Sequence, residues 1–147
     1  MSQRHRVQPI MLFVDGTPRP QPRPRFVRGR VISCADANAK RWISAVEAKA
    51  REQRHQDGPL KGGLFVGLDF TFPAGKARQE GEPHTSRPDA DNLAKLVLDC
   101  LMRAGMIGDD AIVSQLMIRK SYGAKPGVLI YLNVDRRSIR PAPSWID

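Results

Sequence analysis

The chain has 147 residues, with 24 Lys and Arg against 15 Asp and Glu, so its net charge at pH 7 is +9 and its pI is about 10.3. This length favours one domain with a single core, and no apolar run approaches the roughly 18 residues that a membrane-spanning helix needs. The first residues also lack an apolar segment long enough for a secretory signal, so we expect a cytoplasmic protein that binds a polyanion, most commonly nucleic acid.

Residues 9–15 combine apolar and β-branched side chains, which predicts a strand. The next segment, residues 16–25, has prolines at alternate positions, which remove backbone donors and disfavour a helix, so we expect it to run extended along a surface. Seven arginines and a single acid, Asp15, occur in the first thirty residues. This density is typical either of a phosphate contact or of a solvated tail, and the sequence leaves both open.

Residues 35–56 contain neither Pro nor Gly and are rich in helix formers. Ile43, Val46 and Ala50, with Trp42 beside them, form an apolar stripe at helical spacing, which indicates an amphipathic helix that faces the core. The alternating residues 64–72 then predict a second strand.

The stretch 73–88 has turn formers and mixed charge without a hydrophobic period, which is typical of a functional or disordered loop. A helix follows, and residues 111–120 and 127–134 predict two further strands separated by a turn. This order of elements predicts an α+β fold, a single domain with a mixed sheet of about four strands and two main helices packed on one face. The ends, at about 1–8 and 136–147, are expected to be flexible tails.

The most informative region, residues 87–110, reads RPDADNLAKLVLDCLMRAGMIGDD. Its apolar residues occupy most of a helical circumference, which predicts a largely buried helix with Asp91 and Lys95 at the edge of the apolar arc. Asp89 suits the N-cap of this helix and Gly105 suits its C-terminal cap.

Beyond this helix, Gly108 is expected to permit a sharp return that brings the next two aspartates back toward the first two. Carboxylates held close together raise one another's pKa unless a cation neutralises them. Mg²⁺ and Mn²⁺ prefer oxygen ligands and often combine one or two carboxylates with phosphate oxygens of a substrate, where they promote phosphodiester hydrolysis. We therefore expect folding to bring the helix-start acids Asp89 and Asp91 and the acidic pair Asp109 and Asp110 together as a metal site, with Lys95 placed to bind phosphate.

Each of these residues also has an ordinary structural interpretation. An aspartate at a helix start often only caps the helix, and Asp91 and Lys95 are spaced as an i,i+4 surface ion pair. Asp99 is expected to pair with Arg103 or Lys95. The combination of helix-start acids, a lysine one turn later and a second acidic pair in a strongly basic chain favours a functional site.

Two cysteines, Cys34 and Cys100, lack the CxxC spacing of a zinc or redox motif, so we expect free thiols. The three histidines, His5, His55 and His84, are scattered and fit neither a zinc site nor a histidine-based nuclease motif.

Three segments together resemble the RusA family of Holliday junction resolvases (crossover junction endodeoxyribonucleases) of bacteria and phages. They are GEPHTSRPDADNLAKLVLDCLMRAGMIGDD, VSQLMIRKSYG and the proline- and arginine-rich VDGTPRPQPRPRF. The specific part is DxDNxxK followed by a DD pair some twenty residues after its first aspartate. One visible departure is Ile112, where the family usually has glutamine.

The resemblance implies a Mg²⁺-dependent endodeoxyribonuclease, with Mn²⁺ as a possible substitute, that makes paired symmetric cuts across four-way junctions in DNA recombination and repair. It implies a homodimer, which also suits a substrate that needs two cuts from a chain with one set of acids. The implied roles are metal binding and catalysis for Asp89, Asp91 and Asp110, an essential lysine at Lys95, and support of the third acid by Asp109.

Charge alone suggests which residues line the DNA surface. The candidates are Arg19, Arg23, Arg25 and Arg28 in the arginine-rich segment and Lys76, Arg78 and Arg87 in the loop before the acids. Two other functions remain open: a general nicking or flap nuclease with the same metal chemistry, and a non-catalytic or degenerate basic DNA-binding protein in which the acids only cap and pair.

Overall fold

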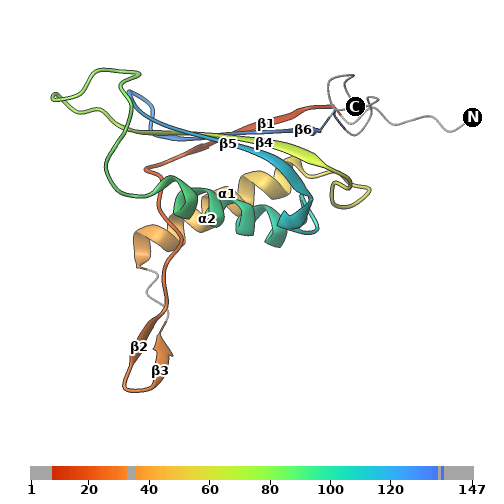
Figure 1. The fold of residues 1–147 in the computed structure, drawn as a ribbon, viewed down its shortest axis with the longest axis horizontal. Helices are drawn as coiled ribbons and strands as arrows, with labels where there is room; N and C mark the ends of the chain where they lie inside the picture. Colours follow the sequence, from red (N-terminus) through yellow and green to blue (C-terminus); the bar gives the residue numbers. More distant parts are fainter. Residues whose placement is uncertain (1–7, 33–35, 136, 138–147) are drawn as a thin grey trace, which may run out of the picture.

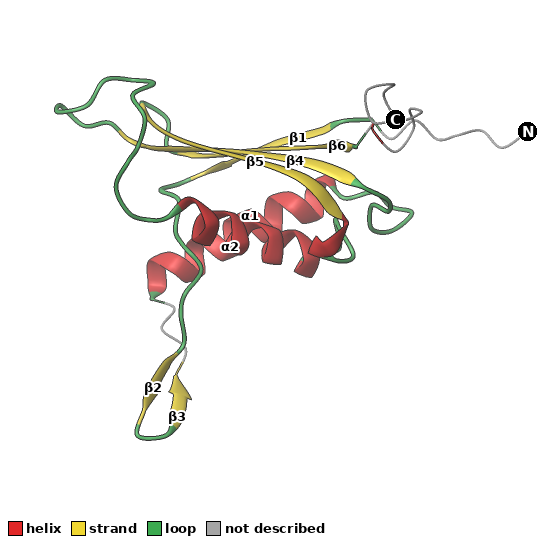
Figure 2. Ribbon diagram, in the orientation of Figure 1, coloured by secondary structure: helices red, strands yellow, loops and turns green. Residues whose placement is uncertain are grey.

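The structure, a computed structural model, describes residues 8–32, 36–135 and 137. It confirms the predicted α+β fold, because a mixed four-stranded sheet carries two helices on one face (Figures 1 and 2). In sheet order the strands are β1 (Ile10–Asp15), β6 (Gly127–Val134), β4 (Leu64–Pro73) and β5 (Val113–Gly123). Only β4 and β5 run parallel. The tails predicted at about 1–8 and 136–147 lie almost entirely outside the described residues.

The helix predicted from residues 35–56 is α1 (Ala37–Gln53), and it begins where the Asp36 carboxylate accepts a hydrogen bond from the Ala39 amide at 2.8 Å. Its buried residues include Trp42, Val46 and Ala50, which are three of the four residues of the predicted stripe. The fourth, Ile43, is partly buried and packs against the core. The expected core-facing helix is therefore confirmed.

The second helix, α2 (Ala90–Arg103), is buried along most of its circumference, as its apolar arc predicts. Gly105 follows it with a φ of 77°, and its amide donates to the Met102 carbonyl at 3.0 Å. The Met106 amide donates to the Leu101 carbonyl at 3.0 Å, which completes a Schellman motif. Gly105 therefore ends the helix as predicted, because few other residues adopt this conformation without strain.

The core lies between the helices and the inner face of the sheet. Alternate residues of β1, β4 and β6 point into it, and Phe70, Leu96 and Ile130 are among its fully buried side chains. Cys100 is a free thiol in this core, as predicted, and burial raises its pKa to about 11; Cys34 lies outside the described residues. No helix in the described part of the chain is both long and apolar enough to span a membrane.

Three local features differ from the sequence prediction. The arginine-rich segment ends in a hairpin of β2 (Arg25–Val27) and β3 (Arg30–Ile32), which we did not predict. A short 3-10 helix, η1 (Asp110–Ile112), replaces the expected start of the third strand. The predicted turn at residues 121–126 begins later, because β5 continues to Gly123 through its pairing with β4.

Candidate active site

The start of α2 presents two exposed carboxylates. Asp89 occupies the N-cap position, as predicted, but its side chain makes no capping hydrogen bond. Asp91 lies in the first turn, where its Oδ1 accepts from the Asn92 amide at 2.9 Å. The ordinary capping interpretation of Asp89 therefore fails, and both carboxylates face solvent at the positive end of the helix dipole.

The extended arginine-rich segment runs past this helix start. The amide of Gln21 donates to the carbonyl of Asn92 at 3.1 Å, which fixes the segment against the first turn of α2. The side-chain oxygen of Gln21 is buried there without a hydrogen-bond partner. A surface pocket forms between the two segments, and it is lined by Arg19, Pro20, Gln21, Arg23, Arg87, Pro88, Asp89 and Asn92.

Three arginines line this pocket together with Asp89, whose side chain makes no capping hydrogen bond. Arginine binds phosphate through a planar fork of donors, and the start of a helix favours anions. The pocket therefore has the composition of a phosphate site with an acid at its edge. Three of the predicted DNA-binding residues, Arg19, Arg23 and Arg87, lie together here.

Lys95 lies one turn beyond Asp91 with its side chain 60% exposed, and its Nζ is 3.7 Å from Asp99 Oδ1. The pairing predicted for Asp99 is thus confirmed, and the alternative pair of Lys95 with Asp91 is not the one that forms. Because the lysine end of this pair is largely exposed to water, the pair contributes only about 0.2–1 kcal/mol. Lys95 is consequently free to exchange Asp99 for a stronger anion.

The second acidic pair lies at the opposite end of α2. Asp109 caps η1, because its Oδ1 accepts from the Ala111 amide at 2.9 Å, and this hydrogen bond holds its pKa below the usual range, with a smaller contribution from Asp110. The Asp110 amide lies 3.2 Å from the sulfur of Met102, near the last turn of α2. Asp109 therefore supports the turn that presents Asp110.

The beginning of β5 is held by a buried carboxylate. Asp135 accepts hydrogen bonds from Ser114 at 2.6 Å and from Gln115 at 2.9 Å. Hydrogen bonds from Arg137, followed by that from Ser114, keep the pKa of Asp135 well below its usual range. Since β5 begins directly after η1, this network also fixes the position of the acidic turn.

The expectation that one folded chain gathers all three metal-binding acids is wrong. The 14 residues of α2 form a rod about 21 Å long, with Asp89 and Asp91 at one end and Asp110 near Met102 at the other. No group of three or more potential ligands among His, Cys, Asp and Glu occurs in the described residues. Gly108 does not bring Asp109 and Asp110 back toward Asp89, because the chain continues from there into η1 and β5.

The loop at 73–88 is attached to the edge of the sheet rather than detached from it. Its backbone makes hydrogen bonds to Lys120 and Tyr122, and the Lys120 Nζ donates to the Ser86 carbonyl at 2.8 Å. His84 stacks between Phe72 and Tyr122, with ring centroids 3.9 and 4.8 Å away. Burial, followed by the charge of Lys120, lowers the pKa of His84. The loop therefore holds the start of α2 against the end of β5.

The remaining predicted DNA-binding residues are dispersed. Arg25 and Arg28 belong to the β2–β3 hairpin, and Lys76 is exposed in the loop. Arg78 is 3.2 Å from Glu82 and lies over the ring of Tyr122 at 5.3 Å. Charge alone did not separate these paired or isolated cations from the three arginines that share the pocket.

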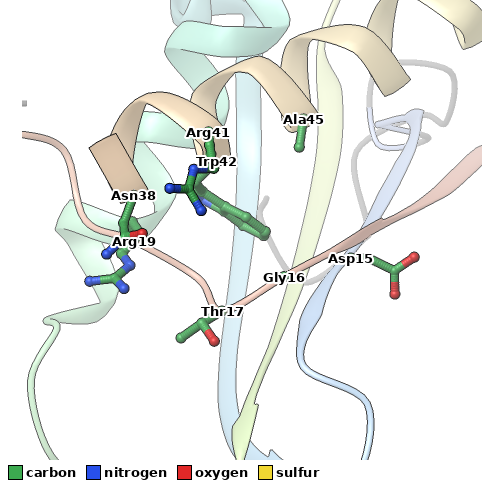
Figure 3. Close-up of a pocket in the computed structure, with 8 residues that line it drawn as sticks. All are labelled: Asp15, Gly16, Thr17, Arg19, Asn38, Arg41, Trp42 and Ala45. Carbon is green, nitrogen blue, oxygen red and sulfur yellow. The ribbon is translucent and has the colours of Figure 1, made fainter. Parts of the chain in front are cut away.

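A second pocket adjoins the first and shares Arg19 with it (Figure 3). It adds Arg41 and Asn38 from the start of α1, above the buried ring of Trp42. Sequence reasoning missed Arg41 because it reads as an ordinary cation on the solvent face of an amphipathic helix. Gln21 was missed as well, although its place in the alternating proline pattern could have marked it.

The two pockets of this basic protein combine arginine and carboxylate side chains, a composition suited to binding phosphate. The chain belongs to the family described as endodeoxyribonuclease RusA, which it matches over residues 15–133, most of its length. The resemblance seen in the sequence is thereby confirmed. A search of curated proteins finds no match.

Proposed function

We propose that this member of the endodeoxyribonuclease family resolves four-way DNA junctions by paired symmetric cuts, in DNA recombination and repair. The observation that carries the proposal is the uncapped carboxylate of Asp89 in a pocket with Arg19, Arg23 and Arg87. A cap that makes no capping bond leaves the carboxylate available for another ligand, and the arginines bring a phosphate to it.

The acids at the start of α2 fit a hard divalent ion. Mg²⁺ commonly takes one or two carboxylates together with phosphate oxygens, and Asp89 and Asp91 offer two exposed carboxylates beside a phosphate pocket. Mg²⁺, or Mn²⁺ in its place, would activate water and stabilise the charge that develops on phosphorus. The arginines orient the DNA strand, and Lys95 adds positive charge one turn away, where it stabilises the anionic transition state.

The separation of the acids suggests how a homodimer completes the site. A second copy is able to place its Asp110 at the Asp89 end of the first copy, so that each site takes acids from both chains. Two such sites arise from one two-fold axis, as a substrate with two strands to be cut requires.

The edge of β5 is the surface that we assign to this dimer. Only its last residues are bonded to the 73–88 loop, whereas Leu116 and Met117 are 44% and 59% exposed along the rest of the strand. A long strand edge with exposed apolar residues favours pairing with another strand. If the β5 strands of two copies paired in antiparallel fashion, the start of each β5 would lie beside the end of the other. The η1 turn of one chain would then approach the end of the partner strand, the end nearer to Asp89.

The test is cleavage of a synthetic four-way junction in Mg²⁺, compared with linear duplex and Y-shaped DNA of the same sequence. The proposal predicts symmetric cuts in the junction, little cutting of the duplex, and loss of cutting without loss of binding when a chelator is added. Equal cutting of all three substrates would indicate a general nicking or flap nuclease instead.

The absence of a three-acid group in the described residues favours one other candidate, a non-catalytic DNA-binding protein. In that case Asp89 and Asp110 only shape the surface. Binding of the junction without cutting under every divalent ion would support it and would remove the catalytic proposal.

A further inference from the structure

The β2–β3 hairpin projects from the body of the protein (Figures 1 and 2). Its two strands pair with each other and not with the four-stranded sheet. The turn consists of Arg28 and Gly29 with φ values of 50° and 75°, which is the left-handed geometry that closes two-residue hairpins. An isolated two-stranded hairpin is only marginally stable in water, so this element is suited to being covered by a partner.

The two faces of the hairpin differ in chemistry. Phe26 and Val31 are cross-strand partners on one face, and they are 79% and 62% exposed. The opposite face carries both charge and apolar surface, with Arg25 opposite Ile32 and Arg30 opposite Val27, and the two aliphatic residues are 47% and 46% exposed. Exposed aromatic and aliphatic side chains grouped in this way mark an interaction site rather than ordinary surface.

Charge identifies the kind of partner. Residues 16–32 contain five arginines and no acid, and the same segment passes from the pocket beside Asp89 directly into the hairpin. A surface of this composition attracts a polyanion, and its five arginines repel the same segment of a second copy. DNA offers phosphates to the arginines and, where its bases are unstacked, apolar faces to Phe26.

We propose that the hairpin places Phe26 and Val31 against unstacked bases at the branch point of a DNA junction, while Arg25, Arg28 and Arg30 contact the flanking phosphates. Stacked duplex offers no such base faces, so Phe26 distinguishes branched from linear DNA. This assignment rests on the proposed function and adds the residue that selects the substrate.

The test compares Phe26→Ala with Phe26→Leu and with Val27→Ala as a control on the opposite face. Binding to a four-way junction and to linear duplex is measured with a chelator present, so that no cutting occurs. Phe26→Ala should weaken junction binding about 10-fold and leave duplex binding unchanged, with a smaller loss for Phe26→Leu and little change for Val27→Ala. Equal loss on both substrates, or no loss on either, would overturn the proposal.

A fluorescence measurement detects stacking directly. Adding the junction should lower the tryptophan emission of the Phe26→Trp variant by more than it lowers that of the wild-type protein, which has two tryptophans of its own. Adding duplex should lower the emission of both proteins equally. Sedimentation of the wild type and of Phe26→Ala without DNA tests the alternative that the hairpin binds a second copy of the chain. If Phe26→Ala weakens self-association, the apolar face binds that copy and the DNA assignment fails.

The outcomes separate this inference from the proposed function. A wild-type protein that cuts junctions, together with a Phe26→Ala variant that binds them normally, would refute the hairpin assignment alone. A protein that never cuts, yet prefers junctions only when Phe26 is present, would refute the proposed function and leave the assignment standing.

Discussion

The carboxylates of Asp89 and Asp91 make few contacts that would stabilise this fold. Asp89 makes no capping bond, and Asp91 accepts only from the amide of the next residue. Asp109, in contrast, holds the η1 turn with its side chain. Asp109 therefore has a clear local role and also interacts with the side chain of Asp110, whereas the carboxylates of Asp89 and Asp91 make few contacts with the rest of the fold.

Replacing Asp91 with Asn should reduce junction cutting by about 100-fold or more, because an amide is a poorer ligand and carries no charge. Junction affinity should stay within a few-fold of wild type, since the arginines are unchanged. Single-turnover cutting and binding without a divalent ion measure the two effects. Undiminished cutting would remove Asp91 from the site.

At this scale the sequence identified the right residue types but not their distances. The DxDNxxK spacing correctly places Asp91 and Lys95 on one edge of a helix, because helical periodicity converts spacing into direction. The distance between Asp91 and Asp110 depends on where the chain goes after Gly105, and no local pattern encodes that. The packing of the whole domain therefore decides that the chain forms η1 after Gly108, where the sequence predicted a sharp return toward Asp89.

The elements themselves were largely predictable. The two helices and the four strands of the main sheet follow from hydrophobic periodicity, and Gly105 ends α2 as its position indicates. The β2–β3 hairpin was missed because Arg28–Gly29 is a weak turn signal compared with Asn–Gly or Asp–Gly. Its strands also expose their apolar residues, so no core-facing pattern marked them.

The 73–88 loop provides a pH-dependent contribution to stability. The pKa of His84 is lowered in the folded state, chiefly by burial, so the folded protein favours neutral imidazole. The stabilising contribution is complete above the unfolded pKa of about 6.5 and is lost as the pH falls below it.

His84→Phe keeps the stack between Phe72 and Tyr122 but cannot take up a proton. Its thermal midpoint should therefore fall less than that of wild type between pH 7.5 and 5.5. The exposed His55→Gln is the matched control and should follow the wild-type curve. Identical curves for wild type and His84→Phe would show that protonation of His84 is not linked to unfolding.

On the scale of the whole molecule, the arginine-rich segment and the start of α2 form one basic surface. The sequence predicted only part of this grouping. Arg19, Arg23 and Arg87 line one pocket because the Gln21 amide donates a hydrogen bond to the Asn92 carbonyl, which joins segments 71 residues apart in the sequence. Net charge predicted a polyanionic partner, whereas the fold decides which cations act together.

Neutralising Arg23, Arg25 and Arg28 together should weaken binding to every DNA sequence and reduce its salt dependence. Each phosphate contact contributes about −0.9 to the slope of log K against log salt, so the loss of three changes the slope by about 2–3. Neutralising the exposed Lys49, Arg51 and Lys61 changes the net charge equally and should leave most of the slope intact. An unchanged slope for the variant that lacks the charges of Arg23, Arg25 and Arg28 would exclude the arginine-rich segment from DNA binding.

The central claim is that acids from the two ends of α2, one end from each of two copies, form the cutting site. Mixing the Asp91→Asn and Asp110→Asn proteins tests it most directly, because each alone should be inactive on a four-way junction. In a mixed dimer one composite site keeps both acids, so the mixture should recover nicking of one strand. If sites lay within single chains, every site in the mixture would lack an acid, and continued inactivity despite confirmed subunit exchange would contradict the account.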